Sequence, residues 1–118
     1  IIATGIMVAE AKKAVELLKK DGINAELISA NVIKPLDEKT ILESIKKTKH
    51  VVTCENHNLI GGLYSAVAEL VCQKYPLNIY GIGIQDRFGQ VGKYNDLLKE
   101  YQMTPQDIYN IVKNNLNE

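Results

Sequence analysis

One stretch of the sequence, residues 51–72, decides the fold class, and it reads VVTCENHNLIGGLYSAVAELVC. Its first four residues form the short apolar run that is typical of a buried strand. Residues 63–71 place apolar side chains three and four positions apart, as on one face of a helix. A buried strand that leads through a polar turn into an amphipathic helix is the repeating unit of an α/β fold.

The same alternation of strand and helix continues on both sides of this stretch. Short apolar runs precede and follow it, and each run gives way to residues with the period of a helix. Strands separated by helices predict a mainly parallel sheet with helices on both faces. We therefore expect residues 1–118 to form a single three-layer α/β/α domain. The expected strands cover residues 1–4, 25–29, 51–54 and 78–84, and the expected helices begin near Met7, Asp37, Leu63, Lys93 and Thr104.

The composition is that of one globular domain of 118 residues, of which 46% are hydrophobic and 24% are charged. Lys and Arg total 14 and Asp and Glu total 14, so the formal net charge is zero. A general polyanion binder would carry a basic excess, so we expect neither nucleic acid nor an anionic membrane as a partner. No apolar stretch approaches the roughly 18–20 residues that a membrane-spanning helix needs. We expect a cytoplasmic location.

The two cysteines, Cys54 and Cys72, match neither a zinc-ligand spacing nor a C-x-x-C motif. Cys54 ends an expected strand, and Cys72 follows an apolar pair in the helix after it. We therefore predict that both thiols are reduced, unpaired and buried. This excludes a disulfide scaffold and a structural zinc site as first interpretations.

Polar residues that could carry chemistry follow the third and fourth expected strands. The third strand is followed by Glu55, Asn56 and His57, and the fourth by Asp86 and Arg87. Because the carboxyl ends of parallel strands meet at one edge of a sheet, we predict that these side chains share one surface region. A carboxylate beside an imidazole could transfer a proton, and the arginine could pair or stack at an interface. Alternatively, these residues bind loop backbone or face a neighbouring domain, since no nucleophile lies beside a base.

Two glycine pairs belong to the same part of the chain. Gly61 and Gly62 precede a helix, where backbone amides could hold a phosphate or another small anion. Gly81 and Gly83 lie within the fourth expected strand. Neither pair completes a nucleotide-binding motif, so we interpret both as packing and turn positions. A free-standing module that binds a small anion stays open as an alternative function.

Several motifs occur in order along the chain: ATG at residues 3–5, PLD at 35–37, ENHNLIGGLYSAVAE at 55–69, DRFG at 86–89 and MTP at 103–105. Together they resemble the C-terminal domain of transketolase, and the resemblance covers essentially the whole chain. Similar domains close deoxyxylulose-phosphate synthase and the β subunit of 2-oxoacid dehydrogenases, and both stay open as alternatives.

The resemblance implies that the domains of the enzyme have different roles. Enzymes of this family transfer a two-carbon ketol unit between sugar phosphates in the pentose phosphate pathway. They bind thiamine diphosphate with Mg²⁺ or Ca²⁺ between a pyrophosphate domain and a pyrimidine domain, so the resemblance implies no catalytic, cofactor-binding or metal-binding residue here. It implies instead that this domain supports subunit packing, in a homodimer or in an assembly of split subunits. The edge that would then face another domain or subunit comprises Glu55, Asn56, His57, Gly61, Gly62, Asp86 and Arg87.

The resemblance also bears on the start of the chain. The family fold is a five-stranded mixed sheet whose first strand runs antiparallel to the others. The present chain opens directly on an apolar run at residues 1–4, without a methionine or a polar lead-in. We therefore expect a fragment truncated at its N-terminus, with four parallel strands here and the fifth, antiparallel strand upstream.

Overall fold

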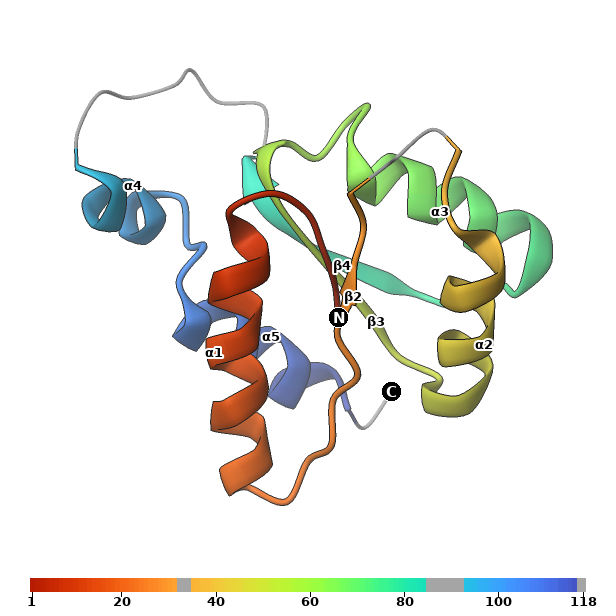
Figure 1. Cartoon of the computed structure of the whole chain (residues 1–118), viewed down its shortest axis with the longest axis horizontal. Helices are drawn as coiled ribbons and strands as arrows, with labels where there is room; N and C mark the ends of the chain where they lie inside the picture. The colour runs from red at the N-terminus through yellow and green to blue at the C-terminus, as the bar shows by residue number, and fades with distance from the viewer. Residues whose placement is uncertain (32–34, 85–92, 117–118) are drawn as a thin grey trace.

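The computed structural model describes residues 1–31, 35–84 and 93–116. Within these ranges strands and helices alternate as far as the last strand, and two helices follow it (Figure 1). No described helix is long and apolar enough to cross a membrane. The bounds of the elements are β1 (Ile2–Ala3), α1 (Met7–Lys20), β2 (Ile28–Ser29), α2 (Glu38–Thr48), β3 (Val51–Asn58), α3 (Leu63–Lys74), β4 (Ile79–Ile84), α4 (Tyr94–Glu100) and α5 (Pro105–Asn115).

The strands of the described ranges form a four-stranded parallel sheet in the order β2-β1-β3-β4. Ile2 and Ala3 of β1 pair with β2 on one side and with β3 on the other. Because the strands run in the same direction, their carboxyl ends meet at one edge of the sheet (Figure 1). The predicted parallel sheet is confirmed, and the fifth, antiparallel strand stays a prediction.

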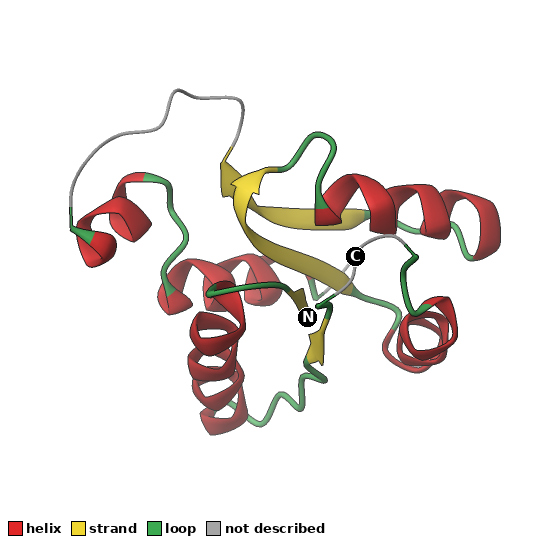
Figure 2. Cartoon of the chain, turned by 45° about the horizontal axis from the view of Figure 1, so that its top comes forward, coloured by secondary structure: helices red, strands yellow, loops and turns green. Residues whose placement is uncertain are grey.

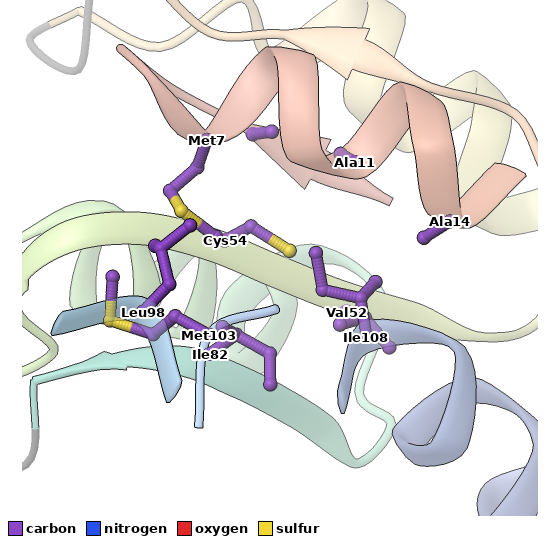
Figure 3. Close-up of a cluster of buried hydrophobic side chains, with 10 residues drawn as sticks. Met7, Ala11, Ala14, Val52, Cys54, Ile82, Leu98, Met103 and Ile108 are labelled. Atoms are coloured by element: carbon purple, nitrogen blue, oxygen red, sulfur yellow. The ribbon is translucent and has the colours of Figure 1, made fainter. Parts of the chain in front are cut away.

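Helices cover both faces of the sheet (Figure 2). On one face, α1, α4 and α5 enclose a cluster that includes Met7, Cys54 and Ile108, each 0% exposed (Figure 3). On the other face, α2 and α3 enclose a cluster that includes Ile41 and Leu63. Burial of one large aliphatic side chain contributes about 1.5–3 kcal/mol, so these clusters hold the three layers together.

Side-chain caps fix where two of the helices begin. Asp37 caps α2 by accepting a hydrogen bond from the backbone N–H of Thr40 at 3.3 Å. At the start of α5, the side chains of Thr104 and Asp107 each accept from the other residue's backbone N–H, which forms a capping box. Such caps satisfy backbone donors that have no partner inside the helix, and the sequence predicts both of them.

The two cysteines differ in exposure, so the prediction that both are buried is only half right. Cys54 is 0% exposed, and burial raises the pKa of its thiol to about 12. Cys72 is exposed, which contradicts the prediction. Leu70 and Val71 face the core, and the next residue of the helix is rotated by about 100° to the outer side.

β3 is longer than the sequence predicts, and this difference decides the geometry of the candidate site. The expected strand ends at Cys54, whereas β3 continues to Asn58 beside β4. The register of the two strands shifts between these residues. Glu55 and His57 therefore belong to a strand at the carboxyl edge, where polar residues had suggested a loop.

Candidate functional site

The buried carboxylate of Glu55 is the centre of the carboxyl edge, and its residue is 0% exposed. Oε1 accepts a hydrogen bond from the backbone N–H of Leu63 at 2.9 Å, and Oε2 accepts one from that of Tyr64 at 2.8 Å. Both donors belong to the first turn of α3, whose N-cap residue Gly62 has no side chain to offer them. Glu55 thus caps the helix from the preceding strand.

His57 supplies a further donor to Glu55. Its Nδ1 lies 2.8 Å from Oε1 of Glu55, and its side chain is 48% exposed. An ionised carboxylate only accepts hydrogen bonds, so Nδ1 carries the hydrogen, and in the neutral ring Nε2 is an acceptor. The buried carboxylate therefore fixes both the tautomer and the orientation of a half-exposed imidazole.

Opposing effects act on the charge of Glu55. Burial raises the pKa of its carboxyl group, because the charged form loses its hydration. The hydrogen bonds from Tyr64 and Leu63 and the neighbouring His57 favour the charged form and oppose this shift. The N-terminus of α3 acts in the same direction as those hydrogen bonds through the helix dipole. The net result is a pKa of Glu55 above its ordinary value.

Gly81 and Gly83 of β4 make room for the side chains at this edge. A Cβ at Gly81 would lie 2.6 Å from Cδ2 of Tyr64. A Cβ at Gly83 would lie 2.7 Å from Cδ2 of Leu59 and 3.1 Å from Cγ of Glu55. Any larger residue would have to displace these side chains, so the interpretation of this glycine pair as packing positions is confirmed.

The turn between β3 and α3 is fixed by hydrogen bonds of its own. The N–H of Leu59 donates to the carbonyl of Ile84 at 3.0 Å, and the carbonyl of Leu59 accepts from the hydroxyl of Ser65 at 3.1 Å. The N–H of Gly61 donates to Oγ of Ser65 at 2.8 Å, and Gly61 has a φ of 83°, which favours glycine. Between them Ile60 is 79% exposed. The turn therefore presents an apolar side chain on an ordered backbone.

The turn that follows β1 meets β3 at the same edge. The N–H of Thr4 donates to the carbonyl of Cys54 at 3.1 Å. A Cβ at Gly5 would lie 3.2 Å from Oδ1 of Asn56, so the two chain segments are in close contact. The next residue, Ile6, is 48% exposed. This edge therefore combines hydrogen-bonded backbone with exposed apolar side chains.

The structure describes only part of the predicted polar edge. Asp86 and Arg87 lie outside the described residues, so their place beside Glu55 stays a prediction. The predicted residues that the structure places on β3 or in the turn after it are Glu55, Asn56, His57, Gly61 and Gly62.

Sequence reasoning missed the way in which Glu55 is used. Its partners are backbone amides eight and nine positions further along the chain, which no local capping motif indicates. One signal was available, because a helix that begins at Leu63 after two glycines lacks the usual Ser, Thr, Asp or Asn cap. Such a helix needs an acceptor from elsewhere, and Glu55 is a nearby carboxylate in the sequence.

The described residues at this edge can take few chemical roles. The amides of Leu63 and Tyr64, which could hold an external anion, are already bonded to Glu55. In the described ranges no group of three or more His, Cys, Asp or Glu side chains could hold a metal ion. The arrangement instead offers Nε2 of His57 as a hydrogen-bonding atom toward a neighbouring molecule.

The opposite edge, where the strands begin, has a pocket of about 480 Å³. Glu26, Ser44, Lys47 and His50 are among its lining residues. Ser44 donates to Oε1 of Glu26 at 2.6 Å, and Lys47 forms an ion pair with the same carboxylate. No sequence motif indicates this pocket, because the residues of its wall lie far apart along the chain.

Comparison with known proteins identifies the family. A family model described as the transketolase C-terminal domain matches residues 1–108. A putative transketolase C-terminal section of Methanocaldococcus jannaschii is 49% identical over 111 residues, which cover 92% of this chain and 34% of that protein. A 6-deoxy-6-sulfo-D-fructose transketolase subunit of Clostridium sp. (strain MSTE9) is 44% identical over 108 residues, with the same two coverages of 92% and 34%.

A more distant relative and a solved structure agree with this family. A 1-deoxy-D-xylulose-5-phosphate synthase of Heliobacterium modesticaldum is 34% identical over 114 residues, which cover 96% of this chain and 18% of that enzyme. A solved structure described as a split gene transketolase, inactive beta4 tetramer, has a TM-score of 0.92 and 38% identity, and covers 98% of this chain and 38% of its own. The chain spans about a third of the length of the transketolase relatives above. It belongs to the transketolase C-terminal domain family.

Proposed function

We propose that this domain is the non-catalytic C-terminal part of a transketolase that transfers a two-carbon ketol unit between sugar phosphates. The proposal is supported by the relative described as a putative transketolase C-terminal section and by the fold shared with a split-gene transketolase. In this proposal the holoenzyme is cytoplasmic and serves the pentose phosphate pathway. The domain supports the assembly of its subunits, either as a homodimer or from split polypeptides.

The use of Glu55 is the observation that carries this proposal. A general acid or base needs an oxygen that can reach the proton to be transferred. In Glu55 each oxygen accepts from a backbone amide of α3, Oε1 also accepts from His57, and the residue is 0% exposed. A carboxylate bonded in this way stabilises the fold, so we assign the edge an architectural role.

The described residues do not fit thiamine diphosphate with its metal ion. The helix amides at the start of α3 are bonded to Glu55, and the described part of the chain has no cluster of His, Cys, Asp or Glu suited to a metal. We therefore assign thiamine diphosphate, with Mg²⁺ or Ca²⁺, to other domains of the parent enzyme.

Calorimetric titration with thiamine diphosphate and Mg²⁺ tests this assignment. We expect no measurable heat of binding for residues 1–118 alone and clear binding for the full-length parent enzyme. Circular dichroism of the fragment is the control for folding. Micromolar binding by the folded fragment would contradict the assignment.

A second candidate is favoured by the 34% identity to a 1-deoxy-D-xylulose-5-phosphate synthase. In that case the parent enzyme would form 1-deoxy-D-xylulose 5-phosphate, and this domain would keep the same architectural role. Assays of the full-length parent for ketol transfer and for that product separate the two candidates. We expect ketol transfer alone, and formation of the deoxy sugar phosphate alone would establish the second candidate.

A further inference from the structure

Ile60 has the greatest exposure among the large hydrophobic side chains of the described residues, at 79%, ahead of Ile6 at 48% and Tyr94 at 44%. Its backbone is held on both sides, by the bonds of Leu59 to Ile84 and of Gly61 to Ser65. An apolar side chain on an ordered turn loses little conformational freedom when a partner covers it. This distinguishes Ile60 from an apolar residue on a loop that must first be ordered.

His57 precedes Ile60 by three residues and is fixed just as firmly. Glu55 holds Nδ1 at 2.8 Å, while 48% of the imidazole side chain is exposed. Nε2 has no hydrogen-bond partner among the described residues, and in the neutral ring it accepts a hydrogen bond from a partner N–H or O–H group. Glu55 acts here as a positioning residue, since it orients the imidazole through a buried contact.

We propose that His57 and Ile60 form the point at which this domain docks onto a second copy of the subunit that carries it. Ile60 enters an apolar recess of that subunit, and Nε2 of His57 accepts a hydrogen bond beside it. This inference rests on the assembly role proposed above, and it names the surface and the partner for that role.

Two observations favour a subunit as the occupant. Residues 56–62 carry no formal charge when His57 is neutral, and they present the exposed apolar side chain of Ile60. Depletion of charge around an apolar side chain is typical of the buried core of subunit interfaces. A nucleic acid or an anionic membrane would instead require cationic side chains at this turn. The solved structure with a TM-score of 0.92 is described as a tetramer of its own β subunits.

The test uses the full-length subunit that carries this domain. Sedimentation velocity over a range of concentrations gives the dissociation constant between subunits for Ile60→Asp, Ile60→Val and His57→Ala. We expect Ile60→Asp to raise it about tenfold or more, and His57→Ala to raise it about threefold. Ile60→Val keeps the apolar contact and should stay close to the wild type. Lys12→Asp, at an exposed position of α1, is the control for a changed charge.

Hydrogen exchange separates a failure of this docking point from a failure of the assembly role. Protection is compared between free and assembled subunits of the wild type. We expect residues 57–62 to gain protection on assembly. If protection appears elsewhere in residues 1–118 while Ile60→Asp leaves the dissociation constant unchanged, the docking point is wrong. If no part of residues 1–118 gains protection, the proposed assembly role is wrong as well.

Discussion

Glu55 and Glu26 stand at opposite edges of one sheet and show two ways to hold a carboxylate. Glu55, at the carboxyl edge, is 0% exposed, and burial raises its pKa. Glu26 lies in the wall of the pocket at the amino edge, which is the edge where the strands begin. Its side chain is 40% exposed, and the hydrogen bonds from Lys47 and Ser44 lower its pKa. The first carboxylate is bonded to two backbone amides and to His57, whereas the second is bonded to the side chains of Ser44 and Lys47.

The contrast shows that the carboxyl edge, whose residues suggest a reactive site, has less room for a ligand than the opposite edge. Parallel sheets generally bind ligands at the carboxyl edge, where Glu55 and His57 lie. Here the chain's own carboxylate fills the helix terminus at that edge. The pocket of about 480 Å³ lies at the other edge. An acidic residue beside a histidine is therefore weak evidence for catalysis until its hydrogen bonds are known.

Glu55→Ala should produce the largest loss of stability and would break the contrast between the two edges. It leaves two helix amides and His57 without their acceptor, so we expect a cost of about 3–5 kcal/mol in the free energy of unfolding. Glu55→Gln keeps an acceptor oxygen and should cost less. Urea unfolding measures both, with Glu26→Ala as the matched control. Equal losses for Glu55→Ala and Glu26→Ala would refute the contrast.

Cys54, which precedes Glu55 in β3, predicts a loss of stability at alkaline pH. Its pKa is about 12 in the folded chain against 9.0 for a free thiol, so the folded state binds this proton more tightly. The stabilisation is complete below pH 9 and is lost as the pH rises toward 12, with about 2–3 kcal/mol gone by pH 11. Unfolding is measured from pH 8 to about 11 for the wild type and Cys54→Ala. The variant should show a shallower slope, and identical slopes would argue against burial of the thiol.

Gly81→Ala tests how tightly the carboxyl edge is packed. The new Cβ would lie 2.6 Å from the ring of Tyr64, and we expect overpacking to cost about 1–3 kcal/mol. Combining it with Tyr64→Ala removes the clash with the ring. The double variant should therefore lose less stability than the sum of the losses of the two single variants. Thermal unfolding of the two single variants and the double variant gives the coupling. Strict additivity would show that the ring simply moves away.

Thr53→Val should have the smallest effect and the opposite sign. Thr53 lies in the middle of β3, between the two edges, and its buried Oγ1 has no hydrogen-bond partner among the described residues. Valine has the same shape without the hydroxyl, so we expect a gain of about 0.5–1 kcal/mol. Urea unfolding measures it against the wild type. A clear loss would reveal a partner for this hydroxyl.

Most of the fold could be predicted from the sequence, because the spacing of apolar residues indicates where the strands and helices lie. The helix starts at Asp37 and Thr104 have local caps that the sequence displays directly. The end of β3 could not be predicted in this way, because it depends on pairing with β4 and on bonds between Glu55 and the backbone of α3, which lie further along the chain. Cys72 was misplaced because one step along a helix turns a side chain from the core to the surface.

The candidate site was predictable as a place and not as a function. The order of strands and helices brings Glu55, His57 and Gly61 to the carboxyl edge, as expected. Whether a carboxylate reacts or caps depends on distances of about 3 Å to backbone groups, and sequence spacing does not set these. The pocket at the amino edge is harder to predict, since no sequence motif marks the residues of its wall.

The turnover number of the full-length parent enzyme with Glu55→Gln tests most directly whether this edge is architectural. If Glu55 transferred a proton in the reaction, replacing its carboxyl group with an amide should lower turnover by about a hundredfold or more. We predict turnover within about threefold of the wild type, measured where circular dichroism and sedimentation show folded and assembled enzyme. A fall of about a hundredfold in folded, assembled enzyme would contradict the architectural role and place Glu55 in the chemistry.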